Sequence, residues 1–357
     1  MKILVLGDGV MGHARQCEAV AQMLKDSCVE SGHPPASILQ TDYKVDVKFK
    51  RSLAAKILYY ALHPQAKRCN GCNRCIRYQV SDRDYAELSG LTADIIISAF
   101  GKRTADVNRW LASRLGAKSV VVMTPRRGLS KFDLAIIPRH DRVEDLPNVI
   151  RTEGSINFMS PQRVLESAAQ LAREIGPMRL FKVALLLGGD YKHFRMSEEM
   201  IARVLSEVKE ACENLDAEMM VTASRRTPTT VIDLLKSELR PYPRCRLLVI
   251  PEEYNPPGAV AGILGLSDIV IVSPESVNMV SEAASSGAHV IVFDEEHFVH
   301  EKHRAFLHNL QSKGNIELVP IHDIAIRVRD FYHGRAHTAL LDDRPAIKSG
   351  LQRLLAI

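Results

Sequence analysis

Residues 185–194, LLLGGDYKHF, run from an apolar stretch into two glycines and then into charged side chains. Glycines that follow a strand let the chain turn tightly, and backbone N–H groups at the start of a following helix can hold a phosphate group. Lys192 and His193 would add positive charge beside that phosphate. Gly188 and Gly189 are therefore candidate phosphate-binding residues, although a plain tight turn would have the same composition.

Two later segments carry polar side chains directly after apolar runs. The segment 222–228, TASRRTP, places hydroxyls and guanidinium groups where they would reach the same phosphate, or where they would simply be solvated. The segment 273–287, SPESVNMVSEAASSG, has serines that can cap a helix. Its carboxylates would accept hydrogen bonds from sugar hydroxyls or favour the helix dipole. The candidate residues of both segments are Thr222, Ser224, Arg225, Arg226, Ser273, Glu275, Ser276 and Glu282.

The first apolar run, KILVLG, leads into DGVMGH at residues 8–13. Residues 7–12, GDGVMG, match the G-x-G-x-x-G pattern of a dinucleotide-binding loop. Such a site also needs an acidic residue about 20 positions on, after a second strand. Residues 27–38 instead have the composition of a loop. We therefore give more weight to His13, because an imidazole at a strand end can take a proton from a hydroxyl near neutral pH. Alternatively, His13 is a residue at a helix start that only forms local hydrogen bonds.

Short β-branched or leucine-rich runs alternate with amphipathic segments of helical length along the chain. That alternation is typical of βα units built around parallel sheets, so we expect an α/β fold. The expected strands form two sets, with no strand between residues 150 and 180. The first set is 2–7, 94–99, 119–124 and 133–138, and the second is 181–188, 217–223, 245–250, 268–273 and 289–294.

The two sets of strands predict two similar Rossmann-like domains, because each half begins with a buried strand that runs into a glycine turn. We expect an N-terminal domain at residues 1–165 and a C-terminal domain at 175–330. A helix within 335–357 would cross back onto the first domain. Open parallel sheets bind ligands beyond the carboxyl ends of their strands, where the candidate residues fall. A cleft between two facing domains would collect them.

Cys69, Cys72 and Cys75 form the pattern C-x2-C-x2-C. This spacing brings three thiols close enough to bind one zinc ion or an iron–sulfur cluster. A complete site needs a further ligand, and free or redox-active thiols are the alternative. The pair Asp82 and Asp84 has the pattern of a capped helix start instead of a metal site at a strand end.

The three cysteines belong to a basic insertion at residues 44–78. Residues 44–77 contain nine Lys or Arg and one acidic residue, so the rest of the chain sums to about −3 within a total of +5. A basic amphipathic segment can rest on an anionic membrane surface, and a helix packed on the core with a solvated basic edge is the alternative. Nucleic acid is disfavoured as a partner, because aromatic platforms and a recognised binding module are missing.

Length and composition indicate an ordinary soluble protein. The 357 residues are 46% apolar and 25% charged, which suits two domains with cores of their own. No apolar run approaches the roughly 20 residues that span a bilayer, and the start of the sequence lacks the features of a secretory leader. Seven cysteines without a leader favour reduced thiols in the cytoplasm.

Six segments follow one another between residues 8 and 287: DGVMGHARQ, SAFGKRT, TPRRGLSKFDLAIIPRHD, LLLGGDYKHF, TASRRTP and SPESVNMVSEAASSG. Taken together, they resemble the mitochondrial-fission Elm family, which occurs in plants and widely in bacteria. The resemblance implies a GT-B-like fold, with two facing Rossmann-like domains as in glycosyltransferases. It also implies that a nucleotide sugar is held mainly by the C-terminal domain.

The resemblance further implies roles for single residues. The donor-site residues would be Gly188, Gly189, Ser224, Arg225, Ser276 and Glu282. His13 and Arg103 would face the acceptor, and Asp8 would orient His13.

The implied reaction is an inverting transfer that needs no metal or other cofactor. A sugar would move from a nucleoside diphosphate to a hydroxyl of a cell-surface glycan or lipid-linked acceptor. The enzyme would work in the cytoplasm, peripherally on the inner membrane. A non-catalytic scaffold that binds a partner or a membrane is the main alternative. A nucleotide-sugar epimerase is less favoured, because no Tyr-x-x-x-Lys pair joins a recognisable cofactor loop.

Overall fold

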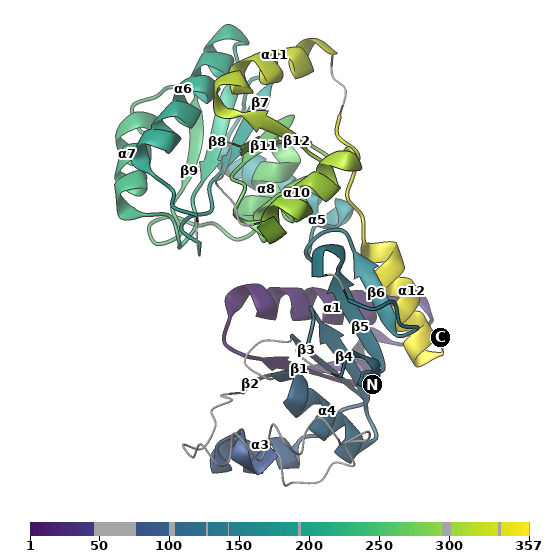
Figure 1. Cartoon of the computed structure of the whole chain (residues 1–357). Helices are drawn as coiled ribbons and strands as arrows, with labels where there is room; N and C mark the ends of the chain where they lie inside the picture. Colours follow the sequence, from purple (N-terminus) through teal and green to yellow (C-terminus); the bar gives the residue numbers. More distant parts are fainter. Residues whose placement is uncertain are drawn as a thin grey trace. The chain divides into compact units, whose positions relative to one another are not determined.

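The computed structural model describes residues 1–45, 76–99, 104–125, 128–141, 143–191, 194–294, 301–334 and 337–356. The chain divides into two compact units (Figure 1). The first unit is Met1–Thr152 with Asp343–Ile357, and the second is Glu153–Asp342. Each unit is built on a six-stranded parallel sheet, which confirms the expected α/β class. The boundary predicted at residue 165 lies inside helix α5, Pro161–Ile175, which belongs to the second unit.

The sheet of the first unit has the strand order β2-β1-β3-β4-β5-β6. All neighbouring strands are parallel, and the order reverses direction between β1 and β3. The strands are β1 (Lys2–Gly7), β2 (Leu39–Lys44), β3 (Ile95–Ala99), β4 (Lys118–Val122), β5 (Leu134–Pro138) and β6 (Val149–Thr152). The helices described in this unit are α1 (Met11–Glu30), α3 (Asp82–Gly90), α4 (Thr104–Leu115) and α12 (Arg344–Leu355).

Helix α12 comes from the end of the chain but packs on the first unit. It contacts α1, β5 and β6. Lys348 Nζ donates to Glu30 Oε1 at 2.6 Å, and Gly350 lies so close to Ile150 that a Cβ would be 2.0 Å from Ile150 Cδ1. The first unit is therefore assembled from both ends of the sequence.

The sheet of the second unit has the order β12-β11-β10-β7-β8-β9, again parallel throughout. Its order reverses between β7 and β10, the point at which doubly wound sheets bind ligands. The strands are β7 (Lys182–Leu186), β8 (Glu218–Thr222), β9 (Cys245–Val249), β10 (Ile269–Val272), β11 (His289–Asp294) and β12 (Glu317–Pro320). The helices are α5, α6 (Glu198–Asn214), α7 (Thr229–Leu239), α8 (Ala259–Leu266), α9 (Val277–Ala284), α10 (Glu301–Ser312) and α11 (Ile324–Gly334).

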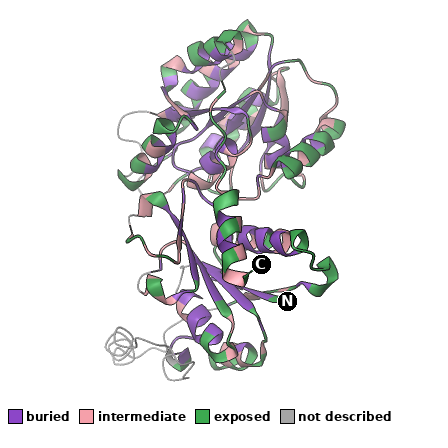
Figure 2. Cartoon of the chain, turned by 90° about the vertical axis from the view of Figure 1, so that its right-hand side faces the viewer, coloured by how far each residue is buried: buried purple, intermediate pink, exposed green. Residues whose placement is uncertain are grey.

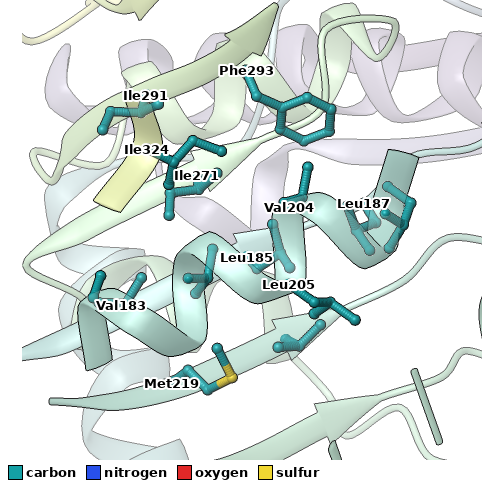
Figure 3. Packing of buried hydrophobic residues seen from close by; sticks show 14 of the residues in the cluster. Val183, Leu185, Leu187, Val204, Leu205, Met219, Ile271, Ile291, Phe293 and Ile324 are labelled. Atoms are coloured by element: carbon teal, nitrogen blue, oxygen red, sulfur yellow. The ribbon is translucent and has the colours of Figure 1, made fainter. Parts of the chain in front are cut away.

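The central strands of the second sheet are buried on both faces. Alternate residues of β7 point to opposite sides, so Val183 and Leu185 join one core while Ala184 and Leu186 join the other. Figure 3 shows Val183 and Leu185 packed with side chains from α6 and from neighbouring strands. The same burial follows the strands of both units in Figure 2, where the strand ribbons are mostly purple. Such double burial explains why these strands read as continuous apolar runs.

Three strands of the structure were not predicted from the sequence. β2, β6 and β12 each form an edge of a sheet, and their sequences LQTDYK, VIRT and ELVP lack a continuous apolar run. Edge strands bury less side-chain surface, so the apolar pattern that predicts central strands is weak there. The strand-free stretch expected from residue 150 is wrong for this reason, since β6 extends to Thr152. The loop expected at 27–38 is shorter, because α1 continues to Glu30.

Candidate functional site

Three loops meet at the carboxyl edge of the second sheet. Residues 188–190 follow β7, residues 224–227 follow β8 and residues 273–276 follow β10. Because these strands are parallel neighbours, their carboxyl ends lie at one edge, beside the point where the strand order reverses. The structure thereby brings together most of the residues that the sequence singles out in this half of the chain.

Hydrogen bonds join the first of these loops to the third. The N–H of Gly188 donates to Ser273 Oγ at 2.9 Å, and the N–H of Gly189 donates to Glu275 Oε1 at 2.7 Å. Both bonds are buried and span more than eighty residues of sequence. The glycine turn is therefore held by side chains that follow β10.

The second loop binds the same turn from its other side. The carbonyl oxygen of Gly188 accepts hydrogen bonds from the hydroxyls of Ser224 and Thr227. The N–H of Asp190 donates to the carbonyl oxygen of Arg226 at 3.1 Å. The three loops consequently form one interlocked structure at the edge of the sheet.

Both glycines are required by close packing. A Cβ on Gly188 would lie 1.8 Å from Glu275 Oε1, and a Cβ on Gly189 would lie 2.1 Å from the carbonyl oxygen of Arg226. This corrects the expectation that a helix starts directly after the glycines and offers their N–H groups to a phosphate. The next helix, α6, begins only at Glu198.

Glu275 is a buried carboxyl group in this cluster, with 2% of its surface exposed. Oε1 accepts the N–H of Gly189, whereas Oε2 is buried without a hydrogen-bond partner among the described residues. Burial raises the pKa of Glu275, while its hydrogen bonds and the charge of Arg226 oppose that shift. Glu275 therefore retains a proton at higher pH than an ordinary glutamate does.

The start of helix α9 is the part of this edge best suited to an anion. Ser276 occupies the N-cap position but makes no side-chain capping bond, so the expectation that Ser276 or Ser273 caps this helix is wrong. The first turn of α9 contains no acidic residue, and a helix N-terminus attracts negative charge. Arg225 is exposed and, among the described residues, forms no hydrogen bond or ion pair. Its guanidinium can therefore pair with a ligand.

The remaining candidates of this half have different surroundings. Thr222 lies inside β8 and is 2% exposed, with its hydroxyl 3.3 Å from the carbonyl oxygen of Ala223, so it is part of the core. Glu282 is half-buried in the middle of α9. The guanidinium carbon of Arg226 lies 5.4 Å from the centre of the Tyr191 ring, and the His303 ring is 5.4 Å from that same ring. The contacts of the Tyr191 ring with Arg226 and His303 were not predicted from the sequence.

In the first unit, an aspartate in the loop after β1 pairs with a histidine in the first turn of α1. Asp8 is 4% exposed, and its two carboxylate oxygens accept the N–H of Val10 at 2.9 Å and Nδ1 of His13 at 2.7 Å. A carboxylate only accepts, so the proton of a neutral His13 ring lies on Nδ1 and the lone pair lies on Nε2. The imidazole is 23% exposed, which gives it access to a ligand.

Several sequence predictions lie outside the described residues. These are Arg103, Lys192, His193, the cysteine triad Cys69, Cys72 and Cys75, and nearly all of the basic insertion. Within the described ranges, no group of three His, Cys, Asp or Glu side chains could hold a metal ion. Asp82 and Asp84 lie at a helix start, where Ser81 Oγ accepts the N–H of Asp84 at 3.0 Å. This agrees with the interpretation of that pair as a helix cap.

The cysteines that the structure describes are free and poorly reactive. They are Cys17, Cys28, Cys212 and Cys245. Burial raises the pKa of Cys212 to about 12 and that of Cys245 to about 11, so neither forms a thiolate near neutral pH. In the same described ranges, no helix is long and apolar enough to cross a membrane.

Two doubly wound parallel sheets, one with polar loops interlocked at its switch point, define a protein of the GT-B fold class. Solved structures support this class at low sequence identity. The UDP-GlcNAc 2-epimerase of Methanocaldococcus jannaschii aligns over 100% of both chains with a TM-score of 0.58 and 10% identity. The chain belongs to the Mitochondrial fission ELM1 family, whose model matches residues 11–336. The family resemblance drawn from the sequence is thus confirmed.

Other similar proteins fit the same assignment. A UDP-GlcNAc 2-epimerase from Neisseria meningitidis, bound to UDP-GlcNAc, aligns over 100% of both chains with a TM-score of 0.58 and 14% identity. Arabidopsis thaliana UGT89C1 aligns over 99% of this chain and 94% of its own, with a TM-score of 0.51 and 12% identity.

Two relatives are similar in sequence. The uncharacterized protein RP120 of Rickettsia prowazekii (strain Madrid E) is 23% identical over 343 residues, which is 87% of this chain and 88% of the relative. Mitochondrial fission protein ELM1 of Arabidopsis thaliana is 23% identical over 228 residues, or 57% of this chain and 52% of the relative.

Proposed function

We propose that this protein is a metal-independent, inverting glycosyltransferase that takes its sugar from a nucleoside diphosphate. The observation that carries the proposal is the start of α9. It lies beside the switch point of the second sheet, and its N-cap side chain leaves the helix uncapped. Helix N-termini at such switch points bind phosphate groups.

The loops of the second unit would bind the donor. In this proposal the diphosphate lies at the N-terminus of α9, where Ser276 donates a hydrogen bond and Arg225 supplies a charged one. These groups would stabilise the negative charge that develops on the departing diphosphate. Glu282, on the same helix, would accept hydrogen bonds from sugar or ribose hydroxyls. Gly188, Gly189 and Glu275 would act indirectly, by fixing the loops.

The first unit would supply the base. His13 Nε2 would take the proton of the acceptor hydroxyl while Asp8 holds the ring through Nδ1 and stabilises the imidazolium that forms. The reaction requires this pair and the bound donor to act on the same acceptor. Arg103 stays a proposed acceptor contact.

The acceptor and the cellular setting belong to the same proposal. A hydroxyl of a cell-surface glycan or a lipid-linked sugar is the acceptor class that the family resemblance favours. The basic insertion at 44–78 would hold the enzyme on an anionic membrane surface at the cytoplasmic face. Its three cysteines stay a predicted zinc or iron–sulfur site with no role in the transfer.

A donor-binding experiment tests the proposal. Nucleoside diphosphates and their sugars should raise the unfolding temperature of the full chain, because a ligand present at about 100 times its Kd stabilises by about 2.7 kcal/mol. Arg225→Ala and Glu282→Ala should weaken the shift. Arg173→Ala, which removes an exposed arginine of α5, is the matched control and should leave the shift unchanged. No response to any nucleotide would favour a non-catalytic scaffold.

A nucleotide-sugar epimerase is the second candidate function. Two solved UDP-GlcNAc 2-epimerases share this fold at a TM-score of 0.58, so the fold alone does not separate epimerisation from transfer. For that reason, the missing Tyr-x-x-x-Lys pair is only weak evidence against an epimerase. Mass spectrometry of the products decides between the two functions. A transferase releases nucleoside diphosphate and forms a glycoside, whereas an epimerase returns an isomeric nucleotide sugar without an acceptor.

A further inference from the structure

The chain passes between the two compact units twice, after Thr152 and after Asp342. On the side of the second unit, the first crossing is residues 153–157 and the second crossing is residues 339–342. Both crossings are hydrogen-bonded to α9, the helix whose N-terminus would bind the donor diphosphate. These bonds lie entirely within the second unit.

The first crossing contacts the first turn of α9 through Ser155. The Ser155 hydroxyl donates to Oδ1 of Asn278, the second residue of the helix, at 2.6 Å. The N–H of Ser155 donates to Ser281 Oγ at 2.8 Å, and the Ser281 hydroxyl donates to the carbonyl oxygen of Val277 at 2.7 Å. Ser155 is 5% exposed and Ser281 is completely buried. The crossing therefore fixes, from the side, the same helical turn that would hold the diphosphate.

The second crossing contacts the other end of the same helix. The N–H of Leu341 donates to the carbonyl oxygen of Ala284, the last residue of α9, at 2.9 Å. The two crossings approach each other at Gly154, where a Cβ would lie 2.6 Å from Leu341 Cδ2 and 3.0 Å from Ser281 Oγ. There is no room for a side chain at this point. The helix and the two crossings therefore pack as one structure.

The first crossing is also attached to α10, in a different way. Glu153 forms an ion pair with Lys313 at 2.7 Å and accepts from Asn309 Nδ2 at 2.8 Å. The Lys313 side chain is 42% exposed, and ion pairs open to water contribute little to stability. The attachment to α9 instead includes the buried bond between the Ser155 N–H and Ser281. The two attachments of one crossing can therefore be broken separately.

We infer that Ser155 and Ser281 are positioning residues of the donor site, and that a nucleotide bound at α9 orders both crossings. This inference rests on the proposed function. A short helix moves as a rigid element, so a ligand that fixes its N-terminus also fixes the groups bonded along it. The coupling is reciprocal, because a loosened crossing weakens nucleotide binding by the same factor by which the nucleotide stabilises the crossing. Donor binding thereby stiffens the two segments that join the second unit to the first.

Hydrogen–deuterium exchange of the full chain tests this coupling in the wild type. The amides of Ser155 and Leu341 report on it directly, because each donates its hydrogen to α9. Saturation with the nucleoside diphosphate that gives the largest thermal shift should slow exchange of residues 153–157 and 339–342 at least fivefold. Helix α11, which packs on α6 and β12, reports stabilisation of the unit as a whole and should change less.

Ser155→Ala separates positioning from stability. It removes the bond to Asn278 in the first turn of α9 but keeps the backbone bond to the helix. The nucleotide affinity should fall roughly fivefold. At saturation, residues 273–282 should be protected as in the wild type, while the protection of residues 153–157 decreases. Lys313→Ala is the matched control, because it detaches the same crossing from α10 and should keep both the affinity and the protection. Titration calorimetry measures the affinity.

Failure of the inference differs from failure of the proposed function. Protection of residues 222–228 and 273–282 without slower exchange at either crossing would overturn the inference and leave the donor site intact. No protection anywhere would contradict both. The inference also fails if Ser155→Ala keeps the wild-type affinity and protection, or if Lys313→Ala loses as much affinity as Ser155→Ala does. If Ser155→Ala does not fold, the exchange result of the wild type decides alone.

Discussion

The two units share a six-stranded parallel sheet but differ in how their carboxyl edges are built. In the second unit, loops after three strands are joined through hydrogen bonds between residues far apart in sequence, such as Gly189 and Glu275. In the first unit, the described polar pair of Asp8 and His13 is local: it joins the loop after β1 to the first turn of α1, five residues apart in sequence. Under the proposed function, the frame from several strands in the second unit would hold the large anionic donor. The proposed base, His13, would need only the local partner Asp8 to orient it.

The largest effect should follow loss of the base in the first unit. We expect His13→Ala to lower turnover by about 10² to 10⁴-fold, the usual contribution of a positioned general base. Donor affinity should stay unchanged, because the donor loops belong to the other unit. Steady-state rates of nucleoside diphosphate release, combined with a donor titration, measure both quantities.

Asp8→Asn serves as the companion variant. The amide preserves the shape of the side chain but can no longer accept from His13 as a carboxylate does, so turnover should fall while the fold is retained. If both variants keep the wild-type rate, Asp8 and His13 take no part in the reaction. The difference between the two units would then have no bearing on catalysis.

The next effect concerns the rigid frame of the second unit. Gly189→Ala places a methyl group 2.1 Å from the carbonyl oxygen of Arg226, which is backbone and cannot move aside easily. We expect a loss of about 3 kcal/mol in the free energy of unfolding and weaker nucleotide binding. Urea denaturation measures the first quantity. Gly334→Ala, at the end of α11, meets no atom within 4 Å and should be tolerated. Equal stability of both variants would contradict the interlocked loops.

The buried carboxyl of Glu275 predicts a pH dependence. Its pKa lies above the usual value of 4.5 in the folded chain, so its contribution to stability is complete below that value and is lost as the pH rises through the folded-state pKa. Glu275→Gln mimics the protonated form and should gain stability relative to the wild type with rising pH. The gain amounts to about 1.4 kcal/mol for each unit of the shift. Denaturation curves between acidic and neutral pH measure this difference, which a carboxylate with an ordinary pKa would not produce.

The smallest effect should come from Ser276. Because its hydroxyl does not cap α9, Ser276→Ala should leave the free energy of unfolding nearly unchanged. The affinity for a nucleoside diphosphate should fall by about 1 kcal/mol through loss of one hydrogen bond. Calorimetric titration and urea denaturation measure the two quantities. If Ser276→Ala lowers the free energy of unfolding by about 1 kcal/mol, as the loss of a helix cap does, and leaves the nucleotide affinity unchanged, the serine stabilises α9 and does not bind a ligand.

The fold was predictable to the extent that strands are buried on both faces. β7 and β10 are apolar runs because their residues face two cores. The edge strand β2, LQTDYK, has four exposed residues out of six, so its sequence lacks an apolar run. The two sets of strands predicted two similar domains, and the family resemblance added their assignment to a GT-B-like fold. It did so through motifs at strand ends and not through the strands themselves.

The site was predictable as a set of segments but not as a set of contacts. The glycines after β7 stand out in the sequence, yet the reason for them is the approach of Glu275 and of the Arg226 backbone, which only the folded sheet brings near. Local composition therefore identified the candidate segments, and tertiary packing determined which of their atoms meet.

Hydrogen–deuterium exchange of the full chain with nucleoside diphosphates tests the central claim most directly, because it compares the two units in one experiment and needs no acceptor. The donor site predicts slower exchange at residues 187–191, 222–228 and 273–282 when the nucleotide binds, with the loop at residues 8–13 little changed. Protection confined to the first unit, or no protection with any of the nucleotides, would contradict a donor site at the carboxyl edge of the second sheet.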